Sequence, residues 1–156
     1  MRFNRGAFSG SSGMHVVNEC LIVPVQSDFD DATLEAMRGE VARQVSRQAV
    51  RGVLMDVSAV RVMDSFVFEG LVETVRMVAL QGAEAVFVGF QPGVVSALMD
   101  LDVATDGLHT AVTMEDGLER LEQLMAHRSS VEEEEEQEEH EYEPEEGAEC
   151  DQDAVE

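Results

Sequence analysis

Residues 52–68 decide the fold, and they read Gly-Val-Leu-Met-Asp-Val-Ser-Ala-Val-Arg-Val-Met-Asp-Ser-Phe-Val-Phe. The run over residues 53–57 is short, apolar and rich in β-branched side chains, which is typical of a parallel strand buried on both faces. Apolar residues then recur at helical spacing and predict a helix over residues 65–80. The stretch therefore joins a buried strand to a buried helix, and functional groups collect at such junctions in open α/β sheets.

The alternation of strand and helix patterns continues on both sides of this stretch. The predicted elements, in chain order, are a β-hairpin over 15–25 with Asn18-Glu19 as its turn, a helix over 28–49, the central strand, the helix over 65–80, a strand over 85–90, a helix from Pro92, a strand over 109–112 and a helix from 113. Strands that alternate with helices predict a single α/β domain, with a mostly parallel central sheet covered by helices.

Apolar spacing also predicts which helix faces are buried. The helix over 28–49 is expected to pack on one side through Leu34, Met37, Val41 and Val45. For the helix from Pro92, the expected apolar face consists of Val94, Val95, Leu98, Met99 and Leu101.

Composition divides the chain into three parts. Residues 1–13 end in Ser-Gly-Ser-Ser-Gly, which predicts a flexible arm, native or left by cloning. Residues 129–156 hold fifteen acidic side chains and no Lys or Arg. Such a segment cannot bury enough surface to offset the entropy cost of ordering, so a disordered acidic C-terminal tail is expected. Residues 14–128 remain as the folded domain.

Charge excludes two classes of partner. The chain carries a net charge of −23, with 33 Asp or Glu residues against 10 Lys or Arg. Nucleic acids and anionic membranes both require a basic footprint, so neither is an expected partner. No apolar run approaches the length of a membrane span, and no signal-peptide pattern follows the N-terminal arginines. A cytoplasmic location is therefore expected.

The motifs of catalysis and cofactor binding are missing from the sequence. A Walker loop needs a lysine, and the chain has none; no G-x-G-x-x-G or G-x-S-x-G motif occurs either. The four histidines have no ligand-like spacing with each other or with the two cysteines. Cys20 lies in an apolar run and is interpreted as a buried small hydrophobe. The sequence thus predicts no enzymatic activity, no cofactor and no metal site.

Ser65 is the residue of greatest functional interest, because it begins the predicted helix directly after Asp64. A Ser or Asp at such a place is first of all an N-cap that accepts from exposed backbone amides. The first turn contains no acid, and Phe68 stands where a capping box would have Glu or Gln. A phosphate on Ser65 would meet the positive helix end and add about two negative charges beside Asp64. These observations are compatible with two roles for Ser65, a helix N-cap and a phosphorylation switch.

Three motifs together resemble one family. They are residues 56–66, the run Gly89-Phe90-Gln91-Pro92 and the run Glu115-Asp116-Gly117-Leu118. The first is similar to the phosphorylation segment of STAS domains, the anti-sigma-factor antagonists and their relatives. The three together resemble the small scaffold proteins of the stressosome. The likeness runs over residues 14–124, and the predicted element order agrees with a single STAS-like domain.

The resemblance implies a regulated scaffold rather than an enzyme. Such proteins co-assemble with longer STAS paralogues into a large cytoplasmic complex that sequesters a switch serine/threonine kinase. On stress, the kinase phosphorylates the serine that matches Ser65 and is released, and a cognate phosphatase resets that serine. Four further residues are expected to contact partners, namely Asp64, Phe66, Gln91 and Pro92. Their alternative roles are cap, core, loop and helix start, and Ser58 is a rival phosphorylation site.

The sequence departs from the family pattern in several places. Some scaffold relatives have a second phosphorylatable residue, a threonine, where this chain has Val88, so a second site there is excluded. Phe66 and Val67 replace the small residues of simpler antagonists, which favours the stressosome type. The alternative is a simple antagonist that binds an anti-sigma-factor kinase one-to-one without a large assembly. A small-ligand or enzymatic role is a third reading, and no base, nucleophile dyad or phosphate loop supports it.

Overall fold

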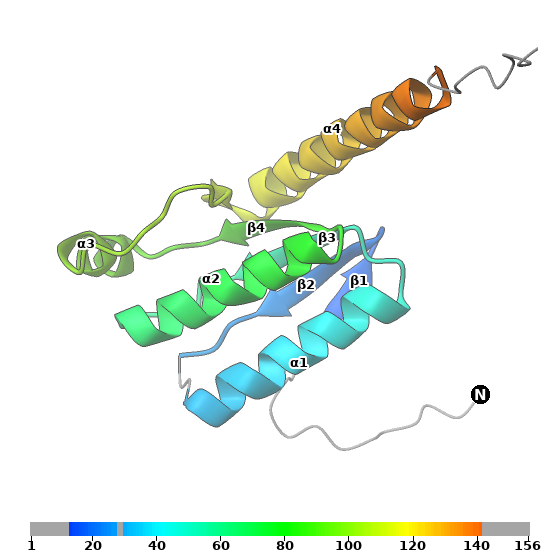
Figure 1. Ribbon diagram of the computed structural model, residues 1–156. Coiled ribbons are helices and arrows are strands. Elements are labelled where there is room, and N and C mark those ends of the chain that lie inside the picture. The colour runs from blue at the N-terminus through cyan, green and yellow to red at the C-terminus, as the bar shows by residue number, and fades with distance from the viewer. Residues whose placement is uncertain (1–12, 28–29, 142–156) are drawn as a thin grey trace, which may run out of the picture. The chain divides into compact units, whose positions relative to one another are not determined.

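The computed structural model describes residues 13–27 and 30–141 (Figure 1). Its elements are β1 His15–Val17, β2 Cys20–Pro24, α1 Asp31–Arg47, β3 Gly52–Asp56, α2 Ser65–Leu80, β4 Glu84–Val88, α3 Pro92–Asp100, β5 Thr110–Ala111 and α4 Met114–Glu141. This is the element order predicted from the sequence. The chain divides into two compact units, Met1–Met125 and Ala126–Glu156, and the first contains the whole sheet.

The sheet has five strands in the order β1-β2-β3-β4-β5. Only the β1–β2 pair is antiparallel, as a hairpin whose turn residues Asn18 and Glu19 both have positive φ. That conformation matches the twist of the two strands. The other neighbours pair in parallel, so that Pro24, Asp56 and Val88 lie level at one edge. The mostly parallel sheet is thereby confirmed.

Both faces of the sheet are covered. Side chains of β3 alternate between them: Val53 and Met55 join the core that α1 and α2 cover, whereas Leu54 joins a second cluster with Leu121 of α4. Figure 1 shows α1 and α2 side by side on their face of the sheet. The four predicted contact residues of α1 are all buried. Burial of β3 on both faces explains why its sequence is an unbroken apolar run.

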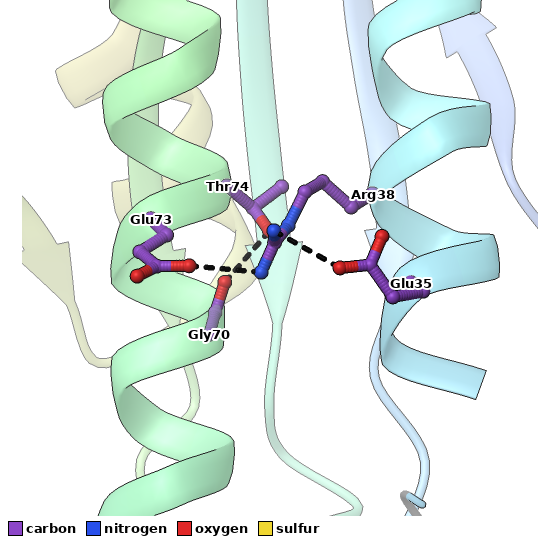
Figure 2. A network of polar contacts seen from close by, with 5 residues as sticks. All are labelled: Glu35, Arg38, Gly70, Glu73 and Thr74. Atoms are coloured by element: carbon purple, nitrogen blue, oxygen red, sulfur yellow. Dashed lines mark hydrogen bonds and ion pairs between the residues drawn. The ribbon is translucent and has the colours of Figure 1, made fainter. Parts of the chain in front are cut away.

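Helices α1 and α2 approach each other closely at Gly70. A Cβ added to Gly70 would lie 2.3 Å from Cδ2 of Leu34, so a larger residue there would require the Leu34 side chain to move. Beside this contact, Arg38 of α1 donates to Glu73 of α2 at 2.9 Å and to Glu35 of its own helix at 3.2 Å (Figure 2). Because Glu35 and Glu73 are largely exposed, these pairs contribute little to the stability of the fold.

Helix α3 is less buried than the sequence predicts. Of the five apolar residues expected on its inner face, only Val94 and Leu98 are buried, and Val95, Met99 and Leu101 are exposed. The reason is geometric, because a helix of nine residues that meets the core along one narrow stripe buries only positions i and i+4.

The final helix also extends further than expected. Thr113 caps it by accepting from the Asp116 backbone N–H at 3.1 Å while donating to the Asp116 carboxylate at 2.6 Å. A nucleated helix grows by one hydrogen bond per residue, and glutamate is a good helix former. Residues 129–141 are accordingly helical where disorder was expected. Disorder of 142–156 and flexibility of the arm up to residue 12 concern residues outside those described, and both stay predictions.

Truncation of Leu71 should destabilise the domain far more than truncation of Leu80 on the same helix. Leu71 is fully buried between α2 and the sheet, whereas Leu80 is 90% exposed. We expect Leu71→Ala to cost about 2–5 kcal/mol of unfolding free energy and Leu80→Ala less than about 0.5 kcal/mol. Urea unfolding of the two variants measures both, and equal costs would contradict the packing of α2 described above.

Candidate functional site

The loops after β2, β3 and β4 meet at one edge of the sheet. Backbone pairing continues beyond the strands, since the Val25 N–H donates to the Asp56 carbonyl at 2.8 Å and the Val57 N–H donates to the Val88 carbonyl at 2.9 Å. The segment 57–64, which leads into α2, therefore begins at a point that is hydrogen-bonded to the chain after β2 on one side and to the end of β4 on the other. This is the carboxyl-terminal edge of the three parallel strands β2, β3 and β4.

Asp64, rather than Ser65, caps helix α2. The Asp64 carboxylate accepts from the Val67 N–H at 2.8 Å, and its backbone carbonyl accepts from the Phe68 N–H at 3.1 Å. Ser65 is the first helical residue and is half-buried. Its hydroxyl has no hydrogen-bond partner among the residues that the structure describes. Asp64 is therefore the N-cap residue of α2, and the Ser65 hydroxyl does not contribute to the cap.

Phe66 is exposed. Of the two positions that the sequence left open for its side chain, in the core or at the surface, the structure shows the surface. Phe66 is 53% exposed although it stands on a helix whose other face forms the core. Val62, in the loop before α2, is also exposed. Phe66 and Val62 therefore both present apolar surface close to Ser65 in the sequence.

Gln91 connects the loop after β4 to the loop after β3. Its side-chain Nε2 donates to the Ser58 carbonyl at 3.1 Å, and it makes no side-chain cap to α3 although it precedes that helix. Pro92 occupies the first turn of α3 and is exposed. The structure thus links Gln91 to the segment that leads to Ser65.

Gly89 allows these two loops to touch. Its φ of +80° is rarely adopted by residues with a side chain, and an added Cβ would lie 2.7 Å from Ser58 Cβ and 3.0 Å from Ser58 Cα. Because part of that contact is with backbone, it could not be relieved by moving a side chain. The sequence marks Gly89 only as part of a motif. Its close approach to Ser58 depends on two loops that are distant in the sequence.

The rival serine, Ser58, is placed differently from Ser65. Its backbone is held on both sides, because its N–H donates to the Asp56 carboxylate at 3.0 Å and its carbonyl accepts from Gln91. It is exposed and lies in the loop rather than on a helix. A residue that sequence reasoning missed, Ser27, donates its hydroxyl to the Ala59 carbonyl at 2.7 Å. Its place just after a predicted strand was the available signal.

Other candidate chemistry is not assembled at this edge. Cys20 is buried, and desolvation, with Glu122 and Glu19 adding to it, raises the pKa of its thiol, so the thiolate is disfavoured. Within residues 13–27 and 30–141, no cluster of three or more His, Cys, Asp or Glu side chains could hold a metal ion. In the same ranges no helix combines the length and apolarity needed to cross a membrane.

Comparison with known proteins gives a consistent result. A family model described as "STAS domain" matches residues 12–115. No curated protein matches this chain. Among solved structures, a serine-to-glutamate variant of RsbS from Moorella thermoacetica is 27% identical, with a TM-score of 0.62 over 71% of this chain and 94% of that one.

Two further solved structures are also similar to this chain. A chain from a structure titled "Molecular architecture of the stressosome, a signal integration and transduction hub" is 28% identical, with a TM-score of 0.63 over 71% of this chain and 96% of that one. The anti-sigma-factor antagonist SpoIIAA in its unphosphorylated form is 15% identical, with a TM-score of 0.53 over 69% of this chain and 94% of that one. At that identity the likeness to SpoIIAA concerns the fold alone.

The division of roles between Asp64 and Ser65 predicts unequal effects of substitution. Asp64→Ala removes the cap on the Val67 amide and should cost about 1 kcal/mol of unfolding free energy. Ser65→Ala removes a hydroxyl without a partner and should change stability by less than about 0.5 kcal/mol. Asp64→Asn, which keeps an accepting oxygen, is the control and should recover most of the loss. A larger cost for Ser65→Ala than for Asp64→Ala in urea unfolding would show that the cap is misassigned.

Substitution of Gly89 tests the contact between the two loops. Gly89→Ala combines an unfavourable φ with a clash against Ser58, and should cost about 1–3 kcal/mol. Gly93→Ala, at a nearby position with open space around the added Cβ, is the matched control and should be close to neutral. Thermal unfolding of the two variants measures the difference, and two unchanged midpoints would refute the close approach.

Proposed function

The chain belongs to the STAS domain family, and on that premise we propose that it is a phosphoregulated scaffold of a stressosome-like complex. In this role it acts as an anti-sigma-factor antagonist that holds a switch serine/threonine kinase until Ser65 is phosphorylated. The single observation that carries the proposal is the hydroxyl of Ser65, which stands at the start of α2 with its capping duty already taken by Asp64.

A phosphate on Ser65 has a strong local effect but leaves the core intact. It carries roughly −1.5 to −2 charges at neutral pH and stands next to the Asp64 carboxylate, which repels it. It also approaches the backbone amides at the helix start, which attract it. Helix α2 remains anchored through Phe68 and Leu71, which are buried in the domain. The modification therefore changes the surface and not the fold.

The surface around Ser65 explains why such a charge would release a partner. Phe66 is exposed on one side, and Gln91 and Pro92 follow the neighbouring strand, tied to the Ser65 loop through the Ser58 carbonyl. A partner that covers Phe66 removes water from this surface. A phosphate on Ser65 would lose its hydration beneath that partner. Arg61 is the one basic residue of this chain close to Ser65 in the sequence, so little positive charge would offset the loss. Binding of the kinase is weakened as a result.

The relatives support the scaffold over the one-to-one antagonist. The two structures of RsbS and of the stressosome chain are 27% and 28% identical and are covered over 94% and 96% of their length. SpoIIAA is 15% identical. The partners proposed are paralogous STAS scaffold proteins, a switch kinase and a cognate phosphatase, all in the cytoplasm. The role is non-catalytic and involves no cofactor, nucleic acid or membrane.

Intact-mass spectrometry tests the phosphorylation site. The chain, incubated with ATP and a switch serine/threonine kinase from the same organism, should gain a single phosphate. Ser65→Ala should gain none, whereas the matched variant Ser58→Ala should gain the same single phosphate as the unaltered chain. Absence of phosphate on the unaltered chain, with a kinase shown to be active on another substrate, would reduce Ser65 to an ordinary first-turn residue. A phosphate lost only in Ser58→Ala would move the switch to the loop.

A further inference from the structure

An apolar groove lies beside α3, at the end of the sheet where β5 stands. Its volume is about 550 Å³, and its walls come from α2, α3, the segment 101–109 and β5. Phe68 and Phe90 line it, together with Val95 and Met99 of α3 and Val112 after β5. Ser65, Gln91 and Pro92 do not line it, although Phe90, which directly precedes Gln91, does.

The outer walls of this groove are apolar side chains that remain in water. Val95 is 45% exposed, Met99 72% and Val112 83%. The sequence predicts Val95 and Met99 to be core residues, and the structure leaves both uncovered on one wall of one groove. Apolar side chains that gather in this way on a folded domain mark an interaction surface.

The segment that forms most of the groove carries charged side chains of one sign only. Residues 91–115 form most of its walls and contain no Lys or Arg. Their charged side chains are four exposed acids, Asp100, Asp102, Asp106 and Glu115. Arg76, the basic residue of α2, lines an adjoining pocket of about 280 Å³ that shares Phe68 with this groove, and two acids, Glu69 and Glu73, line that pocket as well. The groove therefore offers apolar contact inside an acidic rim.

We propose that this groove docks an amphipathic helix of a partner protein, with apolar side chains on one face and Lys or Arg beside them. Charge complementarity selects this occupant, because basic residues flanking the apolar face would meet the acidic rim. The contact would follow the helix-in-groove mode, in which apolar anchors at helical spacing fill the groove. The assignment is independent of the role of Ser65.

Other occupants fit less well. A second copy of this chain would bring two acidic rims together, which is unfavourable. An added β-strand would need a long edge, and β5 has only two residues. A small molecule would need walls that enclose most of its surface, whereas Met99 and Val112 stand mostly in solvent.

Titration with synthetic helices tests the proposal on the full chain. The probe is a Leu/Lys peptide with all Leu on one face, and its control is a Leu/Glu peptide of the same pattern. Binding is followed by tryptophan fluorescence from a Trp placed at the peptide terminus, since the chain itself contains no tryptophan. We expect the Leu/Lys helix to bind and the Leu/Glu helix not to bind.

Variants locate the binding and exclude a general attraction to an acidic protein. The uncharged double variant Met99→Ser with Val112→Ser should weaken the Leu/Lys helix at least about tenfold, equivalent to about 1.4 kcal/mol. Leu80→Ser, which removes an equally exposed apolar side chain elsewhere, should bind like the unaltered chain. Equal binding by all three proteins, or no binding, overturns the proposal. Self-association lost in the double variant would overturn it as well, because a second copy would then be the occupant.

Discussion

Burial of strand β3 on both faces is the constraint from which the rest of the structure follows. Val53, Leu54 and Met55 are fully buried, and the strand pairs in parallel with β2 on one side and β4 on the other. The parallel register brings the ends of all three strands to one edge. The loop that leaves β3 starts from this edge, and its position determines where α2 begins. A shift of β3 by one residue would reverse its faces and displace the whole site.

The side-chain contacts that hold the site together at that edge do not involve Ser65. Asp64 supplies the cap of α2, Gly89 allows the loops to touch, and Gln91 and Ser27 hold the carbonyls of the loop after β3. Ser65 takes part in none of these contacts. A residue free of structural duties can be modified without loss of the fold, which is what a reversible switch requires. Phe66 beside it is exposed, and in the proposed function a partner covers it.

Local patterns in the sequence predicted most of the fold. The hairpin turn at Asn18-Glu19, the bounds of α2 and the parallel sheet all follow from periodicity and turn chemistry. Features that depend on distant segments could not be predicted, such as the bond from Gln91 to Ser58. Apolar spacing also does not reveal how much of a short helix has a neighbour, which is why Met99 was expected in the core. Composition alone did not show that a capped helix continues into residues 129–141.

Retention of the kinase before and after phosphorylation tests the central claim most directly. The chain, its STAS paralogue and the switch kinase are mixed, and the kinase that sediments with the large particle is measured with and without ATP. The account predicts that kinase leaves the particle in proportion to phosphate on Ser65, and that a particle built with Ser65→Ala retains it. Release from the Ser65→Ala particle in step with ATP, or full retention on a completely phosphorylated one, would contradict the account.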